Sequence, residues 1–81
     1  MTTNSDFATI SEVLVFKTNI SSDKEIEKLT KILALEKGIR KWNIDLNDID
    51  NVLRIESNGI HADFIIALLC KASFECEELS D

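Results

Sequence analysis

The chain has 81 residues, of which 44% are hydrophobic, with no proline and only two glycines. This length suits one domain near the lower size limit at which a hydrophobic core suffices, and we expect a polar tail over residues 1–11 and a single domain over 12–81. The net charge of -6 disfavours a nucleic-acid partner, because such binding rests on phosphate neutralisation by Lys and Arg.

A strand and a helix are predicted in the first half of the chain. Residues 13–18 are rich in β-branched and aromatic residues, which favours a central strand. From Asp23 onward the apolar residues recur at helical spacing: Ile26, Leu29, Ile32 and Leu33. We expect Gly38 to cap the C-terminus of this helix, with Lys37 complementing the helix dipole.

The second half predicts a hairpin, a helix and a short strand. Apolar and polar residues alternate over 42–46 and 53–56, and the polar segment 47–51 between them suits a hairpin turn. A second helix is expected over 61–73 and a final strand over 74–79.

The order βαββαβ predicts an α+β, ferredoxin-like sandwich, in which both helices cover one face of an antiparallel sheet. The opposite face of the sheet should then be polar. The side chains expected on it are Lys17, Asn43, Asp45, Arg54 and Glu56.

Targeting signals are not evident in the sequence. The N-terminal stretch lacks the basic start and the apolar run of a signal peptide, and the longest apolar run, 64–70, is too short for a membrane span. Two cysteines are too few for a disulfide framework. We therefore expect a cytoplasmic protein without membrane insertion.

From residue 13 to residue 78 the chain resembles the heavy-metal-associated domains of small copper chaperones and copper-transporting ATPases. The residues that carry the resemblance are Ile20, Leu29, Leu33, Gly38-Ile39, Asn43-Ile44-Asp45-Leu46, Leu53-Arg54-Ile55-Glu56-Ser57 and Lys71-Ala72-Ser73-Phe74-Glu75. In that family a Met-x-Cys-x-x-Cys loop holds a soft cation through two thiolates. An ungapped count places Ser22 and Glu25 on the two cysteine positions.

Ser22 and Glu25 cannot replace those thiolates, because a hydroxyl barely ionises and a carboxylate is a hard oxygen ligand. We expect this degenerate loop to bind no metal and the protein to need no cofactor. Ser-x-x-Glu at a helix start instead predicts a capping box, in which each side chain accepts a hydrogen bond from the backbone amide of the other residue.

The other residues whose side chains could act in catalysis do not form a recognisable catalytic set. His61 is the only histidine, and Asp63 beside it does not make a triad, so we do not expect an enzyme. Cys70 and Cys76 are expected to be inert thiols, since the glutamates around Cys76 disfavour a thiolate. A soft-metal carrier for copper or zinc, using Cys70 and Cys76 or ligands from another subunit, stays open as the alternative function.

The second helix is apolar over most of its circumference. At 100° per residue its sheet-facing side comprises Ile65, Leu68, Leu69 and Ala72. Phe64 and Ile66 then fall on the flanks, while Ala67 and Cys70 point outward. A helix that is apolar nearly all round is usually covered on both sides, so we expect these four residues to meet another protein or a second copy of the chain.

Charge is distributed unevenly along the sequence. Six basic and three acidic residues lie between positions 24 and 41, whereas three basic and twelve acidic residues lie elsewhere. Such polarity can steer a charged partner. The sequence thus predicts a non-catalytic, metal-free relative of the heavy-metal-associated domains that acts as a protein-interaction or regulatory module.

Overall fold

The computed structural model describes residues 12–79. The expected tail over 1–11 and the last two residues of the expected domain lie outside this range. The elements follow the chain as β1 (Glu12–Thr18), α2 (Asp23–Ala34), β2 (Ile39–Asp45), β3 (Val52–Ser57), α3 (Ala62–Lys71) and β4 (Cys76–Glu78). Among the described residues, no helix is long and apolar enough to cross a bilayer.

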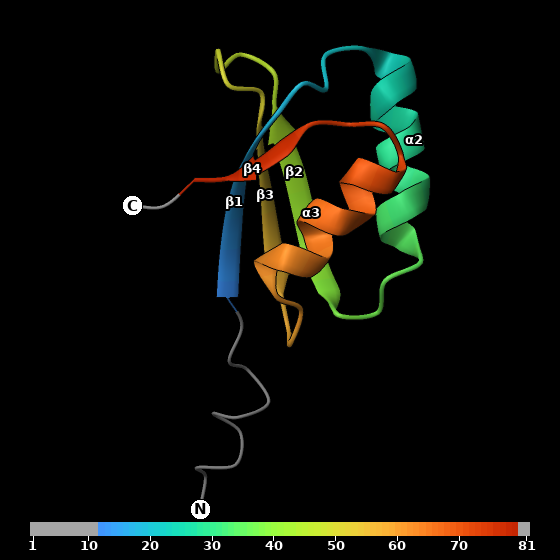
Figure 1. Ribbon diagram of the computed structural model, residues 1–81, viewed down its shortest axis with the longest axis vertical. Helices are drawn as coiled ribbons and strands as arrows, with labels where there is room; N and C mark the ends of the chain where they lie inside the picture. The colour runs from blue at the N-terminus through green and yellow to red at the C-terminus, as the bar shows by residue number, and fades with distance from the viewer. Residues whose placement is uncertain (1–11, 80–81) are drawn as a thin grey trace, which may run out of the picture.

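The described strands form one antiparallel sheet in the order β2-β3-β1-β4. Both helices pack on the same face of this sheet (Figure 1). This arrangement is the expected ferredoxin-like α+β fold, with the hairpin strands β2 and β3 adjacent and β1 and β3 in the centre. The expected element order is confirmed.

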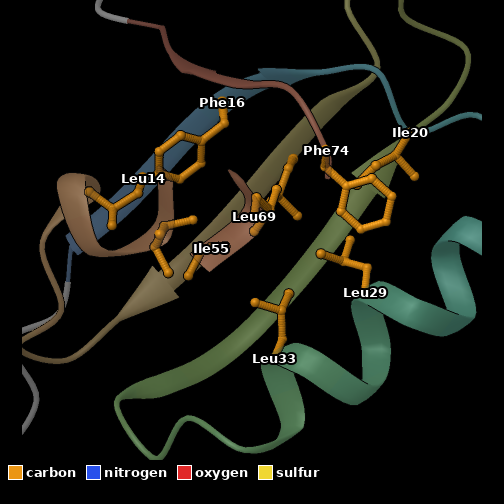
Figure 2. Packing of buried hydrophobic residues seen from close by; sticks show 10 residues of the cluster. Leu14, Phe16, Ile20, Leu29, Leu33, Ile55, Leu69 and Phe74 are labelled. Atoms are coloured by element: carbon orange, nitrogen blue, oxygen red, sulfur yellow. The ribbon is translucent and has the colours of Figure 1, made fainter. Parts of the chain in front are cut away.

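The core lies between the sheet and the two helices (Figure 2). The central strands supply it with alternate residues, because successive side chains of a strand point to opposite faces. Each helix supplies two residues four positions apart, which lie on one helix face. The buried apolar side chains that form this core are Leu14, Phe16, Ile20, Leu29, Leu33, Leu53, Ile55, Ile65, Leu69 and Phe74.

Strand register keeps matching side chains on the inner face. Leu14 pairs with Ile55, and Phe16 pairs with Leu53. Ser57 at the end of β3 is also fully buried. Its hydroxyl donates to the Ile60 carbonyl at 2.7 Å and accepts from the Ile60 amide at 2.9 Å, so its hydrogen-bonding capacity is used where the chain turns toward α3.

The expected end of the first helix is wrong. The helix α2 ends at Ala34 with Leu35 as its C-cap, and Lys31 is the basic residue of its last turn. Gly38 lies beyond the helix, and a Cβ atom there would lie 2.5 Å from Cγ1 and 2.6 Å from Cδ1 of Ile60. Gly38 is therefore required by close packing against Ile60, and Lys37 is too far along the chain to serve the helix dipole.

Strand β2 begins three residues earlier than its alternation indicates. Ile39 pairs with Ser57 and Lys41 pairs with Glu56, which leaves Arg40 in a bulge. Because a bulge inserts an extra residue, it breaks the period of two that marks a strand in the sequence. The final strand is shorter than expected, since only Cys76–Glu78 pair with β1.

The outer face of the sheet is mostly polar, as expected, but the exposed Val13 of β1 also lies on it, paired with Glu56. Lys17, Asn43, Asp45 and Arg54 are exposed there, and Glu56 is half-buried. Lys17 also forms an ion pair with Asp50, with Nζ 3.8 Å from Oδ1.

The two edges of the sheet carry opposite charges. Within the described residues β2 and β4 each pair on one side only. The β2 edge exposes Arg40, Lys41 and Asp45 and is net positive, whereas β4 exposes Glu77 and Glu78.

Candidate functional site

The loop before α2 is organised by the expected capping box. Ser22 is the N-cap, and its Oγ accepts a hydrogen bond from the Glu25 amide at 3.2 Å. Oε1 of Glu25 accepts from the Ser22 amide at 3.2 Å and from the Ser21 amide at 2.9 Å. Ser22 and Glu25 thus stabilise the start of the helix.

The same contacts favour the ionised form of Glu25. Hydrogen bonds to this carboxylate, first of all from the Ser21 amide, lower the pKa of Glu25 below its usual value of 4.5. The carboxylate also lies near the positive end of the helix dipole. The loop therefore holds a negative charge at the N-terminus of α2, where that charge stabilises the helix.

This loop and α2 are also tied to the chain that follows α3. Oδ1 of Asn19 accepts a hydrogen bond from the Glu75 amide at 2.9 Å. Nζ of Lys28 donates to the Ala72 carbonyl at 2.7 Å and lies 5.1 Å from the centroid of the Phe74 ring. The loop before α2 is thus one side of a junction that joins both halves of the fold.

The outer face of α3 is a stripe of exposed residues. Ile65 and Leu69 are fully buried beneath it. The exposed residues of the helix are Asp63, Phe64, Ala67, Cys70 and Lys71. We call this set the α3 stripe. Its centre is apolar, and it includes Phe64 with 45% of its surface exposed.

Ile66 lies apart from the other residues expected on the interaction face. It is half-buried and packs against the core. It also lines a groove of about 350 Å³ together with Cys70, Phe74 and Cys76. A substitution at Ile66 would therefore disturb packing as well as the surface, and Ala67 is the better position at which to test the stripe.

Both cysteines line this groove, which the sequence did not reveal. Ser73, with φ at +70°, reverses the chain between α3 and β4, and Cys70 and Cys76 then line the same groove. Cys70 is exposed, whereas Cys76 is partly covered. Burial raises the pKa of the Cys76 thiol to about 12. Burial therefore keeps this thiol protonated, whereas the sequence indicated the neighbouring glutamates as the cause.

His61 is the N-cap of α3, as expected for a polar residue at a helix start, but its side chain makes no capping hydrogen bond. It lines a shallow groove of about 520 Å³ with Leu35, Ile60 and Phe64. Asp63 is exposed on the first turn of the helix. Among residues 12–79, no group of three or more His, Cys, Asp and Glu side chains is placed to hold a metal ion.

Comparison with known proteins adds no family assignment. Neither a protein-family model nor a curated protein matches this chain. A ferredoxin-like sandwich supports many unrelated functions. The features of this chain that bear on function are the α3 stripe and the capped loop.

Proposed function

We propose that this protein is a non-catalytic, metal-free relative of the heavy-metal-associated domains, and that it is a cytoplasmic protein-interaction or regulatory module. The observation that carries the proposal is the α3 stripe. Phe64, Ala67 and Cys70 are exposed although Ile65 and Leu69 already fill the core side of the same helix. Adjacent exposed apolar side chains mark association surfaces.

The segment 24–41 supports the same proposal. It holds six basic and three acidic residues, and all six basic side chains are exposed, in a protein whose net charge is -6. A local positive surface raises the rate at which an acidic partner docks and fixes its orientation. We propose that this segment steers a partner that the α3 stripe then contacts.

The metal-free part of the proposal rests on the loop before α2. Ser22 and Glu25 occupy the positions of the family's thiolate ligands, and both are engaged in the capping box. Neither side chain offers the soft donor that Cu(I) prefers. We propose that the loop has kept a structural role in place of a metal-binding one.

Affinity capture from native lysate tests the interaction role. The bait would be the wild-type protein, Ala67→Glu in the stripe, or Ile49→Glu, which adds the same charge at a residue 93% exposed in the turn between β2 and β3. We expect proteins that are retained by wild type and Ile49→Glu but lost with Ala67→Glu. An identical set with all three baits would contradict the proposal.

A soft-metal carrier for copper or zinc is the second candidate, because Cys70 and Cys76 line one groove. Two thiols at one surface are the donor type for such cations. Gel filtration after incubation with equimolar Zn(II) or Cu(I) separates the two functions. Metal that stays with the wild type but not with Cys70→Ser would replace the interaction role with the carrier role.

A further inference from the structure

The exposed positions of the α3 stripe are spaced symmetrically about its centre. Ala67 lies at its centre. Phe64 and Cys70 lie three positions to either side of Ala67, and Asp63 and Lys71 lie four positions to either side. These spacings keep all five residues on one helix face, with an apolar middle, an acidic start and a basic end.

We propose that α3 pairs with α3 of a second copy of this chain, antiparallel, around a two-fold axis at Ala67. This inference rests on the proposed function, since it names the partner of the same surface. In a two-fold interface each contact occurs twice, with the roles of the copies exchanged. A stripe whose positions are symmetric about Ala67, with opposite charges at its two ends, fits that symmetry.

The pairing places complementary groups opposite one another. Asp63 of each copy meets Lys71 of the other, so opposite charges meet at both ends of the helix pair. Phe64 meets Cys70 of the other copy, and sulfur contacts with aromatic rings are favourable. Ala67 meets Ala67, whose small side chain lets the two helix axes approach within about 8 Å.

The size of the stripe sets the strength of the dimer. The helix α3 has ten residues, which corresponds to about 15 Å of length. A contact of that length lies below the roughly 1,200 Å² that stable complexes bury. The dimer is therefore weak and forms with rising protein concentration, and added salt weakens it because its end charges are exposed.

Charge reversal tests the pairing directly. Asp63→Lys leaves two positive ends on the stripe, and Lys71→Asp leaves two negative ends, so each variant repels itself. We expect each dimerisation constant to weaken about tenfold or more by sedimentation velocity, since two ion pairs become like-charge contacts. An equal mixture of the two variants should form a heterodimer, because every end pair is then opposite in charge. Ile49→Glu should dimerise like wild type.

Ala67→Glu gives a second route, since it places two like charges at the two-fold axis, and we expect it to be monomeric. The pairing is overturned if wild type stays monomeric up to millimolar concentration, or if the mixed variants do not associate. It is also overturned if amide shifts at Phe64 and Ala67 respond to removal of residues 1–11 but not to dilution, which would assign the stripe to the chain's own N-terminal segment. A strictly monomeric wild type whose captured partners still depend on Ala67 would leave the proposed function standing.

Discussion

At the scale of single residues, Ser22 and Glu25 determine how the start of α2 is stabilised. Both sit where the resemblance expects thiolates, and both contact backbone amides at the start of α2. A cysteine at either position could not complete a capping box, because thiol groups are weak hydrogen-bond acceptors. The capping arrangement and a soft-metal site therefore exclude each other at this loop.

Ser22→Ala should lower the free energy of unfolding by about 1 kcal/mol, because it removes the acceptor for the Glu25 amide. Urea titration followed by circular dichroism measures the change. Ser22→Thr retains a hydroxyl and should lose much less. Equal losses in the two variants would show that the N-cap oxygen does not carry the effect.

The two thiols should differ in reactivity. Cys70 is exposed, whereas burial holds the pKa of Cys76 at about 12 and keeps it protonated. We expect alkylation by iodoacetamide at neutral pH to modify Cys70 well before Cys76, as followed by mass spectrometry. Cys70→Ser should leave only the slow reaction. Fast modification of Cys76 in the folded protein would contradict the burial argument.

At the scale of elements, the approach of the β3–α3 loop to the start of β2 depends on Gly38. Gly38→Ala should destabilise the fold by about 1–3 kcal/mol, because the new methyl group would overlap the Ile60 side chain. Thermal unfolding measures the loss. In the double variant with Ile60→Ala, the loss of stability should be smaller than the sum of the losses in the two single variants. Additive losses would show that contact with Ile60 does not cause the destabilisation by Gly38→Ala.

Lys28 joins α2 to the chain after α3. Lys28→Met removes the hydrogen bond to the Ala72 carbonyl and the contact with the Phe74 ring, and we expect a loss of about 1 kcal/mol in the free energy of unfolding. Lys24→Met changes an exposed lysine of the same helix and serves as the control in the same urea titration. Losses of equal size would show that the junction contributes no stability.

The element boundaries show where sequence reasoning succeeds and where it fails. The helices were predictable because Leu29 with Leu33, and Ile65 with Leu69, repeat at the spacing of one helix face. The start of β2 was missed because Arg40 bulges out of the pairing with β3. The role of Gly38 was misassigned because its cause, the Ile60 side chain, is distant in sequence.

The candidate site divides in the same way. Exposure of Phe64, Ala67 and Cys70 follows from local helix periodicity, which one sequence supplies. The shared groove of Cys70 and Cys76 depends on the chain reversal at Ser73 and on the pairing of β4 with β1. No local sequence pattern predicts this reversal or this pairing. Asp63 and Lys71 lie on the same helix face as Phe64, Ala67 and Cys70. Helix periodicity predicts this placement when it is applied to charged as well as apolar residues.

At the scale of the whole molecule, stability should depend on pH at both extremes. The pKa of Glu25 is lower in the folded state than the usual 4.5, so its contribution is present above that value and is lost as pH falls through the folded pKa. The pKa of Cys76 is raised from 9.0 to about 12, so its contribution is lost as pH rises across that interval.

Chemical unfolding across the pH range measures both effects. Glu25→Gln should flatten the acid side of the profile and leave the alkaline side unchanged, whereas Cys76→Ala should do the reverse. The shape of each profile is the readout, because both substitutions also shift stability at neutral pH. An acid side that is as steep in Glu25→Gln as in wild type would contradict the role assigned to this carboxylate.

The opposite net charges of the two sheet edges disfavour edge-to-edge strand pairing between copies of this protein. Two β2 edges brought side by side would both be net positive, because Arg40 and Lys41 outnumber Asp45, and two β4 edges would both be negative through Glu77 and Glu78. A β2 edge could attract a β4 edge, but β4 pairs over only three residues and the bulge twists β2 away from a straight partner. Growth into fibrils through backbone pairing is thereby opposed at each edge, and contact between copies is left to side chains on the helical layer.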